Sequence, residues 1–350
     1  MGIPGKLLTQ IINVKRWIAL SLSLSTNFNQ SNIYLTSIFF LSAASCPFYS
    51  SLYTGWGAKA NEECFVLIYP LGQTDPEVSD GSCFSVPGYY EFENITSVPC
   101  CCNKADDLFY VPPPVDPSFL RATVEGAVDY FNNGEGKDIL SIDTTRIYMA
   151  GHSNGCMTSL AMGALHSDIV AAVCCHAGTM VTPFADNYSP VPTWMVHGRL
   201  DTVVGFEESD LYFGFGFPGL LEVASVIADK NGCADEIIES DVMDGDTVVG
   251  TSYKYSSGCT NGADVELVAL SESGHVPYKD GEEYVLGAKS TTIDTTAMAW
   301  DFCSSYAKES IPPAFIPAPA PTPDSSVSEL AIVWNLLSTV SLWMLLLFGY

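Results

Sequence analysis

One serine lies in a pentapeptide that is typical of a nucleophile turn. Gly151-His152-Ser153-Asn154-Gly155 matches G-x-S-x-G, between an apolar run at residues 146–150 and a Leu-, Met- and Ala-rich stretch at residues 156–166. A sharp strand-to-helix turn strains the serine backbone, so the residues two positions away must lack side chains. The turn also aims the N–H of Asn154 at a developing oxyanion. We predict that Ser153 is a nucleophile; the alternative is a strand–loop–helix joint with an incidental serine.

A serine hydroxyl is a poor nucleophile until a base takes its proton. The chain offers five histidines, which are His152, His166, His176, His197 and His275. Around a turn of this kind the chain order is nucleophile, acid, base. His275 lies in Ser273-Gly274-His275, in a loop after the last predicted strand, where the base is expected. We therefore predict His275 as the base.

The other histidines have simpler interpretations. We expect the ring of His152 to point away from the serine, His166 to close a helix, and His197 to pack structurally at the end of a strand. His176 is conceivable as a base, but it precedes any good acid. Asp201 lies four residues beyond His197 at the mouth of a strand and is the predicted acid. Glu207 and Asp210 lie deeper in the same loop, and we interpret them as solvated charges.

The elements that must position these residues alternate along the chain. Short apolar runs predict strands at residues 65–69, 146–150, 169–175, 193–197 and 265–270. Helices are predicted at residues 119–131, 156–166 and 220–230. Asp116 before Pro117 is an N-cap signal for the first helix, and Asn231-Gly232 is a stop signal for the last. This alternation predicts a mostly parallel central sheet covered by helices on both faces. Together with the nucleophile turn at Ser153, it predicts an α/β-hydrolase fold.

The charge of the chain excludes some classes of partner. The 350 residues include 40 acidic and 14 basic side chains, for a net charge of −26. A nucleic-acid backbone requires Lys and Arg to displace its counterions, so nucleic acid is not an expected partner. Docking on anionic lipid through a basic patch is disfavoured for the same reason. The hydrophobic content of 47% is enough for a buried core. The sequence does not indicate an oligomeric state.

The cysteines and sequons favour an oxidising compartment. None of the twelve cysteines forms a Cys-x-x-Cys pair, so we expect disulfides rather than a metal site, and no cofactor. Asn-x-Ser/Thr sequons occur at Asn29, Asn94 and Asn187, and we predict glycosylation at Asn94 and Asn187.

Both ends of the chain resemble targeting segments. Basic residues before an apolar stretch predict a signal peptide at residues 1–25, ahead of a catalytic domain at residues 26–308. A Pro-rich linker follows at residues 309–326, and an apolar tail at residues 327–350 closes the chain. The tail is interpreted as a GPI-attachment signal, with a plain membrane anchor as the alternative. The expected location is extracellular or on the cell surface.

Several of these stretches together resemble a known family. They are residues 65–70 (Phe-Val-Leu-Ile-Tyr-Pro), 146–155, 196–204 (Val-His-Gly-Arg-Leu-Asp-Thr-Val-Val) and 273–275. Over residues 53–306 the chain is similar to secreted polyhydroxybutyrate depolymerases and feruloyl esterases of carbohydrate esterase family 1. The resemblance implies Ser153 as nucleophile, Asp201 as acid and His275 as base. It also implies a disulfide between Cys233 and Cys259.

The chain departs from that family near its beginning. The family carries a His-Gly loop before the helix that here spans about residues 53–63, and this loop donates the second oxyanion N–H. No His-Gly occurs here before residue 197, so it is open whether the N-terminal strands are complete. The apolar run at residues 33–41 stands in its place. We predict that this run is a central strand between residues 65–69 and 146–150; the alternative is the apolar core of a cleaved signal.

These features predict a serine esterase that hydrolyses carboxylic esters, in a polyester or an aryl or carbohydrate ester, through an acyl-enzyme. One alternative is a serine peptidase on the same fold, although such enzymes usually carry an additional domain for which the chain has no room. The other is an inert surface protein that keeps the fold for binding. The absent His-Gly pair favours inertness, whereas the intact Ser, Asp and His oppose it.

Overall fold

The fold is described from a computed structural model. It describes residues 34–42, 54–70, 73–74, 82–83, 116–207, 209–210, 216–279 and 291–308. The chain divides into two units, Met1–Phe315 and Ile316–Tyr350, and everything below concerns the first. The predicted signal peptide, the linker, the apolar tail and the sequons at Asn29 and Asn94 lie outside the described residues.

An eight-stranded sheet forms the centre of the first unit, in the order β10-β11-β12-β7-β6-β5-β1-β2. Its strands are β1 Tyr34–Ser42, β2 Val66–Ile68, β5 Ser141–His152, β6 Ala172–His176, β7 Thr193–Gly198, β10 Ile238–Asp244, β11 Thr247–Tyr255 and β12 Val265–Leu270. The six strands β2, β1, β5, β6, β7 and β12, in their order across the sheet, run parallel to one another. Strand β11 pairs antiparallel with β12, and β10 pairs antiparallel with β11. Two further antiparallel pairs consist of strands of two residues each. They are β3 Gln73–Thr74 with β4 Ser82–Cys83, and β8 Ser209–Asp210 with β9 Gly216–Phe217.

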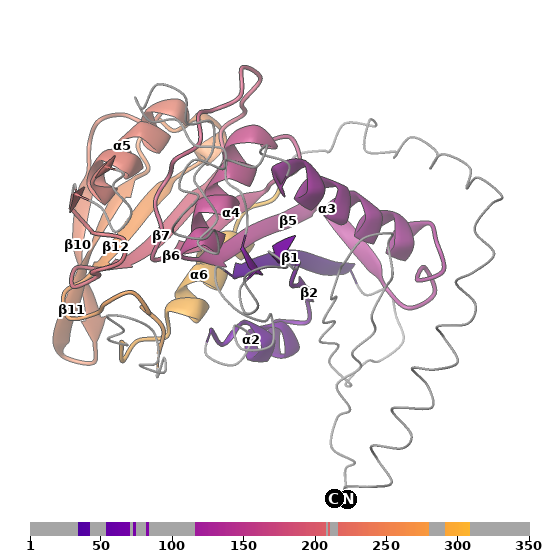
Figure 1. The fold of residues 1–350 in the computed structure, drawn as a ribbon, viewed down its shortest axis with the longest axis horizontal. Helices are drawn as coiled ribbons and strands as arrows, with labels where there is room; N and C mark the ends of the chain where they lie inside the picture. The colour runs from indigo at the N-terminus through magenta and orange to yellow at the C-terminus, as the bar shows by residue number, and fades with distance from the viewer. Residues whose placement is uncertain are drawn as a thin grey trace, which may run out of the picture. The chain divides into compact units, whose positions relative to one another are not determined.

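Helices cover both faces of the sheet (Figure 1). The helices are α2 Trp56–Glu63, α3 Asp116–Asn132, α4 Asn154–Leu165, α5 Leu220–Lys230 and α6 Thr295–Ser304, with a short 3-10 turn at Thr260–Gly262. One buried apolar cluster joins α3, α4 and α5 to one face, and a second joins α2 and α6 to the other. Strands β6 and β7 are buried along their whole length, as expected for strands covered on two sides. The predicted fold class is confirmed.

Strand β1 lies where the sequence predicts it. It pairs in parallel with β2 on one side and with β5 on the other, with Ile38 opposite both Leu67 and Tyr148. Without β1 these two neighbours would be separated by roughly 10 Å, since adjacent strands lie about 4.8 Å apart. The backbone groups along both would then lack partners, at about 1–3 kcal/mol each. The prediction of a central strand at residues 33–41 is therefore confirmed for its position in the sheet.

Several bounds differ from the sequence prediction. Helix α5 matches its predicted range, whereas β5 begins at Ser141, before the apolar run, and β6 begins only at Ala172. The antiparallel hairpin of β10 and β11 was not predicted, because six of the seven residues of β10 are exposed and the hairpin lacks a long apolar run. Its one local signal is the turn at Gly245, a glycine with φ 57° that follows Asp244. Helix α6 was also missed, although Asp294 caps it by accepting a hydrogen bond from the N–H of Ala297 at 2.9 Å.

In the part of the chain that the structure describes, three disulfides link elements that are distant in sequence. Successive residues of β6 point to opposite faces, so Cys174 bonds Cys303 of α6 while Cys175 bonds Cys156 of α4. The third disulfide joins Cys233 to Cys259, the pair implied by the family resemblance. Cys64 is free and exposed. None of the helices in these ranges is long and apolar enough to cross a bilayer.

Candidate active site

Ser153 occupies a tight turn between β5 and α4. Its φ of 57° lies in the left-handed region, which is strained for a residue with a side chain. The turn is held by a hydrogen bond from the Ser153 N–H to the His176 carbonyl, at 2.9 Å. A Cβ on Gly151 would overlap the backbone carbonyl of Gly155, so the glycines are required by this close approach. This is the nucleophile elbow of the α/β-hydrolase fold.

His275 connects the serine to the predicted acid. Its Nε2 lies 2.9 Å from the Ser153 Oγ, and its Nδ1 lies 2.8 Å from the Asp201 Oδ2. Facing a carboxylate, Nδ1 carries the proton and donates it, so the lone pair of Nε2 is directed at the serine hydroxyl. Ser153 is half-buried while His275 is buried, so solvent reaches the serine more readily than the imidazole. The structure thus brings the three predicted residues into one hydrogen-bonded chain.

The loop that bears His275 packs directly on the end of β7. A Cβ on Gly198 would overlap the carbonyl oxygens of Ser273 and Gly274. The N–H of Leu200 donates to the Ser273 carbonyl at 3.0 Å. A glycine at position 198, three residues before Asp201, is therefore needed to let the loop that bears His275 approach the end of β7.

Asp201 is surrounded by four hydrogen-bond donors. Its Oδ1 accepts from the backbone N–H groups of Val203 at 2.8 Å and Val204 at 2.9 Å. Its Oδ2 faces His275 and also His197, whose Nε2 lies 3.1 Å away. Burial alone would raise the pKa of the Asp201 carboxyl, but the hydrogen bonds from His197 and His275 hold it well below its usual range. The acid is therefore ionised and fixed in orientation.

His197 has a role that the sequence analysis missed. It was interpreted as a packing residue, yet its Nε2 lies 2.7 Å from the Val204 carbonyl as well as 3.1 Å from Asp201. A carbonyl oxygen only accepts hydrogen bonds, so Nε2 of His197 carries the proton. This N–H group is shared between the Val204 carbonyl oxygen and the Asp201 carboxylate. His197 thus ties the acid and its loop to the end of β7. The spacing of four residues between His197 and Asp201 was the available signal.

His152 supports the base from the other side. Its Nε2 lies 2.6 Å from the His275 carbonyl, and the two rings are 4.9 Å apart between centroids. Burial, together with the charge of a protonated His275, lowers the pKa of His152 to about 3. A neutral ring with its proton on Nε2 therefore donates to the backbone of the base. The contact was not anticipated, because it joins residues 123 positions apart.

The remaining histidines lie outside this chain of hydrogen bonds. His166 ends α4 and has its Nδ1 3.5 Å from Arg121, which also pairs with Asp168. His176 is fully buried and stacks on Tyr278, with centroids 4.4 Å apart. Of the two other acids weighed, Glu207 is exposed and lies 3.7 Å from Arg199, whereas the side chain of Asp210 lies outside the described part of the chain.

The oxyanion site is described on one side only. Asn154 is the first residue of α4 and is buried, at the helix end whose dipole favours negative charge. The segment after β1, where the resemblance implies the second donor, lies outside the described residues. In the ranges that are described, no cluster of three or more His, Cys, Asp or Glu side chains could hold a metal ion. Asn187, the predicted glycosylation site, is exposed.

Comparison with known proteins returns distant structural likenesses. An acetyl xylan esterase from Aspergillus awamori is 11% identical and aligns over 74% of this chain and 89% of its own, with a TM-score of 0.46. Esterase PE8 is 13% identical over 76% of this chain and 94% of its own, with a TM-score of 0.41. A dienelactone hydrolase-like promiscuous phosphotriesterase from metagenomic libraries is 11% identical over 79% and 89%, with a TM-score of 0.43. No protein-family model and no curated protein matches the chain. The function must therefore be argued from the geometry of the chain itself.

Proposed function

We propose that this protein is a serine esterase that hydrolyses carboxylic esters through an acyl-enzyme at Ser153. The observation that carries the proposal is the unbroken chain from the Ser153 Oγ through both nitrogens of His275 to Asp201, with separations of 2.9 and 2.8 Å. Both distances are within the range for proton transfer between a nucleophile and its base. The first member of this hydrogen-bonded series, Ser153, lies on a strained turn that holds its hydroxyl at the N-terminus of α4.

The proposed reaction has two steps, acylation of Ser153 and hydrolysis of the acyl-serine. His275 takes the Ser153 proton as the Oγ attacks the ester carbonyl, and Asp201 stabilises the resulting imidazolium. The N–H of Asn154 stabilises the tetrahedral oxyanion. The imidazolium then protonates the departing alcohol, which leaves an acyl-serine. In the second half-reaction His275 activates a water that releases the acid and regenerates Ser153.

We further propose that the enzyme works outside the cell or on its surface, on a polyester or an aryl or carbohydrate ester. Three disulfides within the described ranges and an exposed sequon at Asn187 support an oxidising compartment. The family resemblance supports the substrate class. The alternative of an inert binding protein rests on the absent His-Gly pair, and the alignment of His275 with both partners weighs against it.

A fluorophosphonate probe tests the proposal directly, since it labels only an activated serine. We expect labelling of the unsubstituted protein and hydrolysis of p-nitrophenyl butyrate, with both lost by three orders of magnitude or more in Ser153→Ala. Ser257→Ala is the matched control, because this serine is exposed and its contacts with Ala234 and Cys259 are made by its backbone carbonyl. Undiminished turnover in Ser153→Ala would contradict the mechanism, and an unlabelled, inactive native protein would favour the binding alternative.

A further inference from the structure

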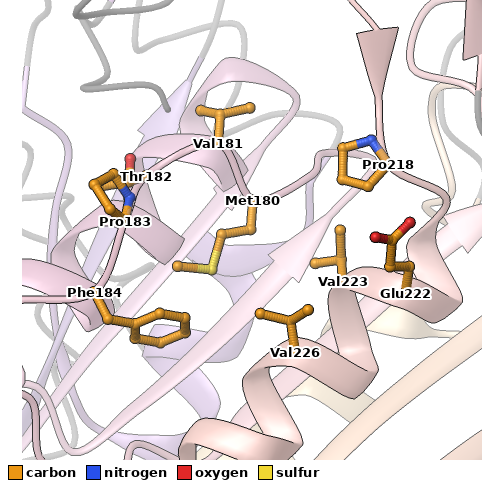
Figure 2. Close-up of a pocket in the computed structure, with 9 residues that line it drawn as sticks. All are labelled: Met180, Val181, Thr182, Pro183, Phe184, Pro218, Glu222, Val223 and Val226. Atoms are coloured by element: carbon orange, nitrogen blue, oxygen red, sulfur yellow. The ribbon is translucent and has the colours of Figure 1, made fainter. Parts of the chain in front are cut away.

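A groove separate from the hydrogen-bonded chain lies between the segment after β6 and the start of α5 (Figure 2). Its volume is about 380 Å³, within the range of small-molecule sites, roughly 300–1,000 Å³. Figure 2 shows Met180 and Phe184 on one wall, with Val223 and Val226 of α5 on the other. The groove is therefore formed by two segments that follow neighbouring parallel strands, β6 and β7.

The groove begins close to the nucleophile. Gly178 approaches the elbow so closely that a Cβ there would lie 2.7 Å from the Ser153 carbonyl oxygen. Met180 follows two residues later, and two residues span at most about 7.6 Å, so its Cα lies within about 12 Å of that oxygen. Val181, which also lines the groove, packs in one cluster with Met157 and Val204. One wall of the groove therefore packs against residues whose backbone N–H groups bond Ser153 and Asp201, since the N–H of Met157 donates to the Ser153 carbonyl and that of Val204 to the Asp201 carboxylate.

The chemistry of the walls favours an uncharged, apolar occupant. Apart from Thr182 and Glu222, the lining consists of Met, Val, Pro and Phe side chains. The carboxylate of Glu222 is exposed, and with a net charge of −26 on the chain it disfavours an anionic ligand. Val226 lines the groove and is 44% exposed. Covering such a side chain with hydrocarbon is favourable because apolar surface leaves water.

We propose that this groove binds the apolar part of the ester substrate, an alkyl chain or an aryl ring, while its ester carbonyl lies at Ser153. The inference rests on the proposed esterase function and adds the substrate class: esters with a hydrophobic group of several carbons. The walls themselves do not distinguish a group on the acyl side from one on the alcohol side, and the two arms of the experiment separate them.

The experiment compares esters of increasing chain length. One arm uses p-nitrophenyl acetate, butyrate and octanoate, and the other uses methyl, butyl and octyl acetate. Val226→Asp places a charge in the groove at an exposed position, and Val248→Asp is the matched control, since Val248 is 51% exposed on β11. We expect Val226→Asp to lower kcat/KM for the octyl or octanoyl ester at least tenfold, with less than a twofold change for the shortest ester of that arm. The control should change neither.

A second variant keeps the test decisive if the charged one fails to fold. Val226→Thr preserves the shape of the side chain, and we expect a fall of twofold or more that is again confined to the long esters. Equal changes for short and long esters, or no change for the long ones, would overturn the inference while leaving the esterase function intact. Absence of turnover for every ester by the unsubstituted protein would overturn the function and the inference together.

Discussion

The carboxyl ends of the parallel strands and the antiparallel hairpin of β10 and β11 belong to one sheet but present opposite environments. At the strand ends, the side chains of the site are almost fully enclosed: His152 is 4% exposed, His197 1%, Asp201 6% and His275 3%. On the hairpin even large apolar residues face solvent, with Met243 47% and Val248 51% exposed. Ionisable groups are thus buried where they are hydrogen-bonded to one another, and apolar groups are exposed where no layer covers them.

The difference follows from what each region must bury. Parallel strands are connected through helices, so their carboxyl ends meet at one edge beneath the loops that carry function. There the hydrogen bonds of His197, His275 and two backbone N–H groups compensate for burying the Asp201 carboxylate. The hairpin needs no connecting helix and leaves six of the seven residues of β10 exposed. We therefore expect substitutions at the strand ends to lower activity, and substitutions near the hairpin to lower stability alone.

The largest expected effect is on Asp201. Asp201→Asn keeps the size of the side chain but removes the charge that stabilises the His275 imidazolium, and it changes the tautomer that Nδ1 favours. We expect kcat for p-nitrophenyl butyrate to fall by roughly three orders of magnitude. Asp241→Asn, on the exposed strand β10, is the control and should retain full activity. Loss of less than tenfold at Asp201 would show that the comparison between the two regions is wrong.

Removal of the disulfide between Cys233 and Cys259 tests the expectation that changes near the hairpin lower stability alone. It closes a separation of 26 residues that includes β10 and β11. Replacing both cysteines by alanine should lower the free energy of unfolding by about 3 kcal/mol in the chain-entropy model, with less than a twofold change in kcat/KM. Denaturant titration and ester hydrolysis measure the two quantities. Cys64→Ser, which removes an exposed free thiol, should change neither.

His197 is expected to act through Asp201 and not on the substrate. His197→Phe removes one of the donors to the carboxylate, and a hydrogen bond to a charged group contributes about 1.5–3 kcal/mol. We expect kcat to fall about 10- to 100-fold with KM unchanged. His197→Gln, which retains an N–H donor, should recover part of the loss. A rise in KM with unchanged kcat would contradict this positioning role.

The smallest expected effect concerns acid stability. Burial, with a further contribution from neighbouring His152, lowers the pKa of His176 to about 3, whereas an unfolded histidine titrates near 6.5. Between these values the unfolded chain binds the proton and the native protein does not, so stability falls as the pH falls from about 6.5 to 3. His176→Phe keeps the ring that stacks on Tyr278 and should reduce this dependence by one proton, about 1.4 kcal/mol for each pH unit.

Denaturant unfolding between pH 4 and 7.5 measures that slope. His166→Gln is the comparison variant: burial and the nearby Arg121 also lower the pKa of His166, but this residue is only partly buried at the end of α4, so we expect a smaller change in slope than for His176→Phe. An unchanged slope in His176→Phe would mean that His176 takes up a proton in the native protein. No histidine lies on the hairpin strands β10 and β11, so this source of acid lability belongs to the parallel region alone.

Much of this protein could be predicted from short stretches of its sequence. The turn at Ser153, the strand at residues 34–42 and the range of α5 are specified locally, by glycines, apolar runs and stop signals. The chain order of nucleophile, acid and base was enough to select Asp201 and His275 among their competitors. These predictions depend on interactions between residues that are close in sequence, or on the limited number of ways in which a parallel sheet is connected.

The tertiary structure decided the contacts between distant residues. The support of Asp201 by His197 and of the His275 carbonyl by His152 depends on loops that meet at one sheet edge, and the second pair is 123 positions apart in sequence. The same holds for the pairing of Cys174 with Cys303, and for the groove between Met180 and Val226. The hairpin of β10 and β11 forms because β12 offers a strand edge, not because its own residues form an apolar run. Local propensity cannot encode such contacts, since their free energy arises only when separate elements are packed together.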